Sequence, residues 1–250
     1  MDRLKFSRAK HNAKLKHLNL GLGYTFSLLS GWSCPFAKEC LSKVVETPVG
    51  LRIKDGPHTK FRCFSASQEV LFPTLYKQRK HNLELLKHKT RPEMVKLIIE
   101  SLPNKFDFIR IHVGGDFFNQ DYLLAWVDVA SLNPTKIFYA YTKSLPYWIR
   151  AKSYIDKVPN FVLTASYGGT QDKLISTGNL RYSKVVFSIE ESEQLGLEID
   201  HDDHLAVSKD VPKFALLIHG QMPKGSEAIK AVQKLRKKGI FGYGKKSVSA

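Results

Sequence analysis

Residues 108–132 read FIRIHVGGDFFNQDYLLAWVDVASL and place a strand, a glycine turn and a helix in direct succession. Phe108 to Val113 is short, apolar and rich in β-branched residues, which is typical of a strand buried on both faces. Gly114 and Gly115 end that strand, and Gln120 to Leu132 has the periodicity of a helix. The stretch therefore predicts one β-then-α unit.

The same unit recurs along the chain, and the recurrence decides the expected fold. A series of such units predicts an α/β protein with a parallel sheet, either open and doubly wound or closed into a complete or partial barrel. We favour a partial (β/α)6 TIM-like barrel with function at the carboxyl ends of its strands, because polar or glycine-containing turns end most of them. The other expected strands are 24–28, 137–142, 161–165, 185–189 and 214–219, and the other helices are 74–89, 92–102, 146–155, 170–176, 190–195 and 223–238.

Length and composition bound the class of protein. The chain has 250 residues, of which 43% are hydrophobic and 25% charged, so we expect a single domain over residues 1–250. No apolar run is long enough to span a bilayer, and the basic N-terminus lacks the apolar stretch of a secretory signal. We therefore expect a cytoplasmic location. No Gly-x-Gly-x-x-Gly follows the first strand, so dinucleotide binding has no support.

The charge is strongly positive and clustered. Lys and Arg number 39 against 23 Asp and Glu, a formal charge of +16, which attracts polyanions such as nucleic acid. Basic residues gather in an N-terminal arm (1–19), around residues 77–81, and in a C-terminal helix and tail (223–250). The alternative is that these clusters are ordinary solvated faces. The expected phosphate contacts are Lys10, Lys14, Arg79, Lys80, Lys234, Arg236, Lys237 and Lys238.

All three cysteines follow the first expected parallel strand, in one long loop. Cys34, Cys40 and Cys63 are too few, and odd in number, for a secreted disulfide framework. Thiolates gathered in one loop suit zinc or an iron–sulfur cluster, and three ligands leave one position open for water or substrate. His58 is the nearest fourth ligand for a closed structural site. The alternative is three small buried hydrophobic residues.

Polar side chains and glycines at the expected strand ends are the candidate catalytic and cofactor-binding residues. Asp116 follows Gly114-Gly115 and is a candidate base or nucleophile, with helix N-capping as the alternative. His112 and His219 are candidates for proton transfer, or satisfied core histidines. Lys143 offers an ammonium to a phosphate or carboxylate. A second pair of glycines, Gly168 and Gly169, is expected to open on the same face and to admit a small cofactor, whereas residues 200–204 (DHDDH) are expected to form an exposed loop.

Four separated blocks of sequence carry a resemblance to a known family. They are Cys34-Pro35-Phe36-Ala37-x-x-Cys40, the run from Cys63 to Ser67, the run from Arg110 to Phe117 with Tyr122 and Trp126, and the run from Tyr139 to Ser144. In this order they resemble the phage "gene product eighty-eight" family.

A wider likeness concerns chemistry. The β/α units, three cysteines after the first strand and Gly-Gly-Asp after the second are similar to the partial barrel of radical SAM enzymes. That resemblance implies a [4Fe–4S] cluster on Cys34, Cys40 and Cys63, with S-adenosylmethionine at Gly114, Gly115 and Asp116. A weaker resemblance, to tRNA-guanine transglycosylase-like barrels, implies guanine exchange in DNA with Asp116 as nucleophile or base.

The expected function follows from these features together. We expect a metal- or Fe–S-dependent enzyme, radical SAM-like, that modifies nucleic acid, with bases of phage DNA as the first choice and RNA as the second. One alternative is base exchange between guanine and a deazaguanine. The other is a non-catalytic DNA-binding protein in which a structural metal cross-links the long loop.

Overall fold

The computed structural model of the chain describes residues 2–241. Residue 1 and residues 242–250, which include the expected basic tail after the last helix, lie outside the described part. The strands are β1 (Ser7–Arg8), β2 (Gly23–Phe26), β3 (Ser42–Thr47), β4 (Gly50–Asp55), β5 (Phe108–Ile111), β6 (Ile137–Thr142), β7 (Phe161–Ser166), β8 (Tyr182–Val186) and β9 (Lys213–Leu217). The α-helices are α1 (Phe64–Leu71), α2 (Pro73–Leu86), α3 (Arg91–Ser101), α4 (Gln120–Ser131), α5 (Leu145–Ile155), α6 (Lys173–Thr177), α7 (Ile189–Gln194), α8 (His204–Val207) and α9 (Glu227–Lys237).

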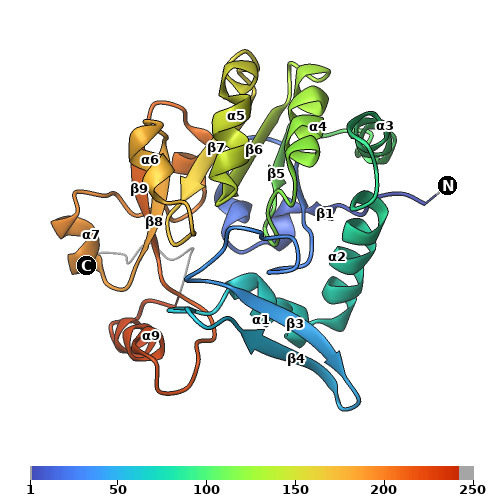
Figure 1. Cartoon of the computed structure of the whole chain (residues 1–250). Helices are drawn as coiled ribbons and strands as arrows, with labels where there is room; N and C mark the ends of the chain where they lie inside the picture. The colour runs from blue at the N-terminus through green and yellow to red at the C-terminus, as the bar shows by residue number, and fades with distance from the viewer. Residues whose placement is uncertain (1, 242–250) are drawn as a thin grey trace.

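The main sheet has seven strands in the order β1-β2-β5-β6-β7-β8-β9. All neighbouring pairs are parallel except β1 and β2, which are antiparallel. The six parallel strands therefore follow one another in chain order across the sheet, with helices in the connections, as Figure 1 shows. The expected α/β class with a mostly parallel sheet is confirmed.

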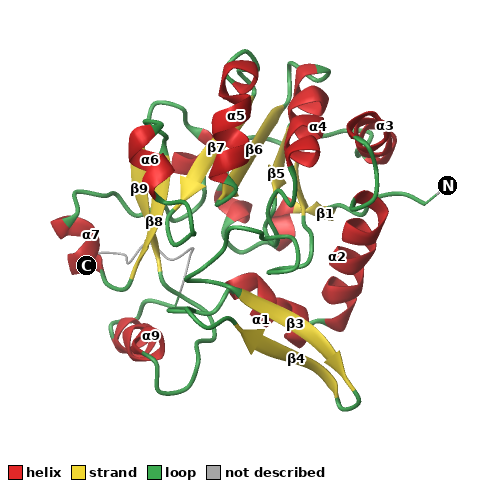
Figure 2. Ribbon diagram, in the orientation of Figure 1, coloured by secondary structure: helices red, strands yellow, loops and turns green. Residues whose placement is uncertain are grey.

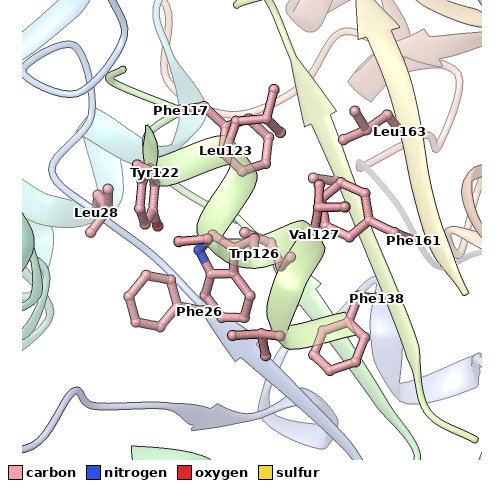
Figure 3. Close-up of a cluster of buried hydrophobic side chains, with 14 of the residues drawn as sticks. Phe26, Leu28, Phe117, Tyr122, Leu123, Trp126, Val127, Phe138, Phe161 and Leu163 are labelled. Atoms are coloured by element: carbon pink, nitrogen blue, oxygen red, sulfur yellow. The ribbon is translucent and has the colours of Figure 1, made fainter. Parts of the chain in front are cut away.

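The two faces of the sheet have different coverings. Alternate residues of β5 show this, because Ile109 and Ile111 belong to the core formed with the helices, whereas Phe108 belongs to a second core on the other face. On the helix side, the indole of Trp126 from α4 lies between Phe26 and Phe138, as Figure 3 shows. Burying three such aromatic side chains supplies much of the free energy that holds α4 on the sheet.

The second core is built by the N-terminal arm rather than left open. Within the expected arm, β1 pairs with β2, and two short 3-10 helices span Ala9–His11 and Leu15–His17. Ala9, Leu15 and Leu18 are buried against Phe108, Tyr139 and Phe214. The segment is therefore part of the folded domain. Its apolar residues cover a face of the sheet that would otherwise be exposed to solvent.

A hairpin and a helix interrupt the segment that the sequence predicts to be one long loop. β3 and β4 form an antiparallel hairpin, and α1 follows it before α2. Along Ser42–Thr47 the first four residues alternate between buried and half-exposed, which is the period of a strand with one face on the protein. In Figure 2 the connection from β2 to β3 lies between the parallel strands and this hairpin.

Helix starts agree with local capping chemistry. Thr90 and Glu93 form a capping box at α3, and the side chain of Asn119 accepts a hydrogen bond from the N–H of Tyr122 at the start of α4. Asn119, and not Asp116, is thus the N-cap of α4. Among residues 2–241 no helix is long and apolar enough to cross a membrane.

Candidate functional site

The three cysteines converge beside the carboxyl ends of β2 and β5. Cys34 lies in the turn after β2, Cys40 lies just before β3, and Cys63 immediately precedes α1. Burial raises the pKa of the Cys34 thiol well above its usual value, and the charges of Asp116, Cys63 and Cys40 raise it further. Burial and the neighbouring Cys40 raise the pKa of Cys63 to about 11. Cys40 and Cys63, which are 23 residues apart in sequence, are therefore close enough to repel each other when ionised.

Two sets of hydrogen bonds fix the cysteine-bearing segments. The backbone N–H of Gly31 donates to Cys34 Sγ over 3.3 Å, and the N–H of Cys63 donates to Ser42 Oγ over 3.3 Å. Ser42 Oγ in turn donates to Asp55 at 2.8 Å, and Asp55 is also paired with Arg62 at 2.6 Å. The base of the hairpin thus sets the position of Cys63.

A buried ion pair joins the segment before Cys34 to the helix after Cys63. Glu69 of α1 accepts hydrogen bonds from the backbone N–H and the hydroxyl of Ser30, at 3.1 and 2.8 Å. The same carboxylate oxygen lies 2.8 Å from Arg79 Nη1 of α2, and both charged side chains are almost fully buried. Arg79 also donates to the backbone oxygen of Ser65 at 3.0 Å. The pair therefore positions two of the cysteine-bearing segments relative to each other.

Asp116 lies between the ends of β5 and β6. Its carboxylate accepts hydrogen bonds from Thr142 Oγ1 at 2.6 Å, from the N–H of Phe117 at 2.7 Å and from the N–H of Lys143 at 2.8 Å. Burial raises its pKa, and these bonds together with the charge of Lys143 oppose that rise. The expected candidate base is therefore held in one orientation, next to Cys34.

Lys143 projects from the end of β6 toward β7. Its ammonium donates to Ser166 Oγ at 2.5 Å, and the residue is 8% exposed. Within the described residues no carboxylate lies within 4.0 Å of this ammonium, although its charge opposes the rise in the pKa of Asp116. A desolvated cation of this kind is suited to an anionic group of a ligand.

The four candidate cofactor glycines lie against protein atoms. A Cβ on Gly114 would meet Ser65 Oγ at 2.2 Å, and one on Gly115, whose φ is +88°, would meet Ser33 Oγ at 2.5 Å. Gly168 and Gly169 are covered by the cysteine segment: the carbonyl of Gly168 accepts from the N–H groups of residues 38 and 39, and residue 37 bridges to Gly169. Close packing of the chain on itself therefore accounts for the missing side chains at all four positions.

The two candidate histidines lie in different surroundings. His112, at φ +63°, turns its ring between Phe117 and Tyr122, with Nε2 3.0 Å from the Tyr122 hydroxyl. His219 follows β9 and packs against Phe64 with ring centroids 4.4 Å apart, which places it beside the start of α1. Burial lowers the pKa of each to about 3, and the charges of Lys14 and Arg110 contribute at His219. Both imidazoles are neutral at pH 7.

The expected phosphate contacts divide into two groups. Contrary to expectation, Lys14 and Arg79 are buried: Lys14 pairs with Asp203 at 2.5 Å and Asp200 at 3.5 Å, and Arg79 with Glu69. Charge alone did not distinguish them from surface lysines, because both lie within basic runs. The others are exposed or half-exposed, namely Lys10, Lys80, Lys234, Arg236, Lys237 and Lys238.

Two further groups of metal-ligand-type side chains lie outside the cysteines. Residues 200–204 were expected to be an exposed loop, but Asp200 and Asp203 are buried beside Lys14. Ligand atoms of Asp200, Asp202 and His204 lie within 4.8 Å of one another, although Lys14 already neutralises part of their charge. His58 is exposed and lines a cavity of about 370 Å³ with Lys38 and Leu41, which flank Cys40.

The residues that sequence reasoning missed are those that hold the site together. Glu69, Ser30 and Ser42 make the long-range contacts just described, and their partners lie 10 to 39 residues away in the chain. Glu69 carries the one available signal, a lone acid on an otherwise uncharged helix (FSASQEVL).

Comparison with known proteins identifies one family. No curated protein and no solved structure matches the chain. The sequence pattern of Gene product 88 matches residues 3–238, which include all the cysteines and strands described above. The chain belongs to the Gene product 88 family.

Proposed function

We propose that the protein is a metal- or Fe–S-dependent enzyme that modifies nucleic acid, with bases of DNA as its substrate. The observation that carries the proposal is the convergence of Cys34, Cys40 and Cys63 beside Asp116 at the carboxyl ends of parallel strands. Thiols that ionise against one another are costly to bury, and a bound cationic centre would reverse that cost.

The sheet topology supports a partial barrel as the scaffold. Six parallel strands in chain order, each followed by a crossover, are the arrangement of a (β/α)-type barrel that stays open between its first and last strands. In such scaffolds the loops after the strands form the reactive face, whichever chemistry is hosted. The cysteines, Asp116 and Lys143 all lie on those loops.

The donor set consists of three thiols, which suit an iron–sulfur cluster or zinc and leave one position open for water or substrate. When bound, such a cluster would supply one-electron chemistry.

The remaining side chains have roles that follow from their contacts. Asp116 is fixed by three hydrogen bonds, and its charge raises the pKa of the Cys34 thiol. Lys143 would bind an anionic group, a carboxylate of a co-substrate or a phosphate, in the place where its ammonium now donates to Ser166. Neutral His219 would offer a hydrogen bond without adding charge.

The surface charge supports a nucleic-acid substrate. Lys234, Arg236 and Lys237 are exposed on the last turns of α9. Neutralising phosphates with such side chains releases counterions and makes binding depend on salt.

Anaerobic purification followed by iron, sulfide and zinc analysis tests the proposal. We expect about four iron and four sulfide per chain with broad visible absorption, and consumption of S-adenosylmethionine when DNA is added. Cys34→Ala, Cys40→Ala and Cys63→Ala should each lose both metal and activity, whereas Lys143→Met should keep the metal and lose activity. One zinc without iron would overturn the cluster and favour a non-catalytic DNA-binding protein with a structural zinc site. Absence of any metal would show that the cysteines serve as small packing residues.

A further inference from the structure

Trp32 is an exposed aromatic residue beside the cysteines. Of the three tryptophans in the chain, Trp126 and Trp148 are buried, whereas Trp32 is 52% exposed. It lies two residues before Cys34, in the turn that follows β2. A single exposed ring is ordinary on a protein surface, so the place of Trp32 beside the cysteines and its fixed orientation, rather than its exposure, distinguish it.

The ring of Trp32 is held rigidly by the hairpin. Its Nε1–H donates to the backbone oxygen of Val44 at 2.9 Å, and the ammonium of Lys43 lies 4.8 Å from the ring centroid. Gly31, at φ +72°, allows the turn to approach the hairpin so closely that a Cβ there would meet the backbone oxygen of Ser42 at 2.5 Å. The indole therefore presents its exposed surface in a fixed orientation, which lowers the entropy lost on stacking.

The outward face of the hairpin carries like charges directly opposite one another. In the β3–β4 register Lys43 lies opposite Lys54, and Val45 opposite Arg52. Residues directly opposite share a face, as do residues two apart, so Lys43, Lys54 and Arg52 lie on one face. Within the described residues none of the three forms an ion pair with a carboxylate.

This arrangement works against the stability of the hairpin. Like charges directly opposite each other in a ladder are destabilising. Among the described residues no acid pairs with them, and the ring of Trp32 offsets the charge of Lys43 alone. The inner face, with Val44 opposite Ile53, is apolar and suffices to hold the strands on the protein. The outer charges are therefore better explained by an anionic partner than by folding.

We propose that Trp32 and the basic hairpin face (Lys43, Arg52 and Lys54) bind single-stranded nucleic acid, with an unpaired base stacked on Trp32 beside the cysteines. The inference rests on the proposed function and names the form of its substrate. Every base offers a flat face to an aromatic ring, while the neighbouring cations hold the phosphates. Figure 1 shows the hairpin projecting from the body of the molecule, where single-stranded nucleic acid can lie along it.

A base stacked on Trp32 would lie next to Cys34 and Cys63. Lys43 follows Ser42, whose hydroxyl accepts a hydrogen bond from the N–H of Cys63, so the basic hairpin face adjoins the cysteine site. Phe64, on the other side of Cys63, is 38% exposed as well. An enzyme that modifies a base must take that base out of the duplex or meet it unpaired, and both require a platform of this kind.

Trp32 makes the test direct, because emission from the other two tryptophans comes from buried rings. Labelled oligothymidylate and a duplex hairpin of equal length are titrated into the protein, following label anisotropy and tryptophan emission together. We expect the single strand to bind more tightly and to quench emission. Trp32→Ala should weaken single-strand binding by about tenfold to a hundredfold, and Trp32→Phe by much less.

Matched variants separate stacking from charge and from folding. Phe72→Ala, which removes a ring of similar exposure (55%), should leave binding unchanged. Neutralising Lys43, Arg52 and Lys54 should lower the salt slope for single strands by about 2, and Lys96→Gln on α3 should not. Single-strand binding without a change in emission, and equal in Trp32→Ala, would overturn this surface and leave the proposed function standing. Absence of binding to either oligonucleotide would overturn both.

Discussion

Two buried ionic clusters hold this protein together, and they differ in redundancy. Near the cysteines, Glu69 has one cationic partner among residues 2–241, Arg79, at 2.8 Å. On the opposite face of the sheet, Asp203 has two, Lys14 at 2.5 Å and Arg110 at 2.6 Å, and it also accepts hydrogen bonds from two tyrosine hydroxyls. The first cluster joins the segments that carry the cysteines, whereas the second holds the N-terminal arm on the sheet.

This difference predicts where a single substitution lowers the free energy of unfolding most. A buried charge that loses its sole counterion keeps its desolvation penalty with nothing to offset it. A charge that keeps a second counterion and its hydrogen bonds loses only one interaction. Redundancy, more than burial, should therefore rank the effects of mutation in the two regions.

Removing Arg79 should have the largest effect on stability. Arg79→Met leaves Glu69 buried without a counterion, and we expect the free energy of unfolding to fall by about 3–5 kcal/mol. Urea denaturation measures it. The matched control is Lys80→Met on the same helix, which breaks only the exposed pair with Glu46 and should leave the midpoint almost unchanged. Equal midpoints for the two variants would contradict the role given to the buried pair.

Removing Lys14 should have a smaller effect, because Arg110 remains beside Asp203. Asp200, which Lys14 meets at the longer distance of 3.5 Å, keeps its hydrogen bond from the Tyr141 hydroxyl. We expect Lys14→Met to cost about 1.5–3 kcal/mol, the range for a hydrogen bond to a charged group. The arm should also open more often, so trypsin should cleave faster after the exposed Lys10 and Lys16. A loss as large as that of Arg79→Met would show that the second cluster is not redundant.

The sequence predicted the regular elements better than the contacts between them. All six parallel strands lie within a few residues of their predicted positions, since runs such as Ile137 to Thr142 are apolar throughout. The hairpin and α1 were missed, because Pro48 and Gly50 are residues typical of loops and obscured the strands on either side of the turn.

The candidate site was predicted in its parts and not in its assembly. The cysteines, Asp116 and Lys143 were recognised from residue type and from their place after strands, a local signal. The burial of Lys14 and Arg79 depends on acids 189 and 10 residues away, Asp203 and Glu69. Nothing in a basic run indicates which lysine or arginine meets such a partner, because that choice is made by tertiary packing.

The low pKa values of His112 and His219 should make the free energy of unfolding fall in acid. His112 and His219 each have a pKa of about 3 in the folded protein, below the usual 6.5. Below pH 6.5 the unfolded chain binds protons that the folded protein does not, so stability is full above that pH and falls as pH decreases, by about 1.4 kcal/mol per unit for each histidine.

Two-dimensional NMR of the nine histidines checks this expectation. Two imidazoles should remain neutral down to about pH 5, and the urea midpoint should fall between pH 7 and pH 5. In Lys14→Met one of the two, His219, should titrate at higher pH, because the positive charge of Lys14 lowers its pKa. The titration of His112, which lies against Tyr122, should not move. Equal shifts in both would contradict the selective effect of the Lys14 charge on His219.

The smallest effect on stability is expected where charge is most exposed, at the end of α9. Changing Lys234, Arg236 and Lys237 to Gln removes no buried contact, so each should alter the free energy of unfolding by about 0.5 kcal/mol or less. If α9 contacts phosphates of duplex DNA, the salt slope of binding should nevertheless fall by about 3. Filter binding between 50 and 200 mM salt measures that slope, with Lys96→Gln as the control. A stable variant with an unchanged slope would assign duplex contacts to another surface and show that the charge of α9 is a solvated face.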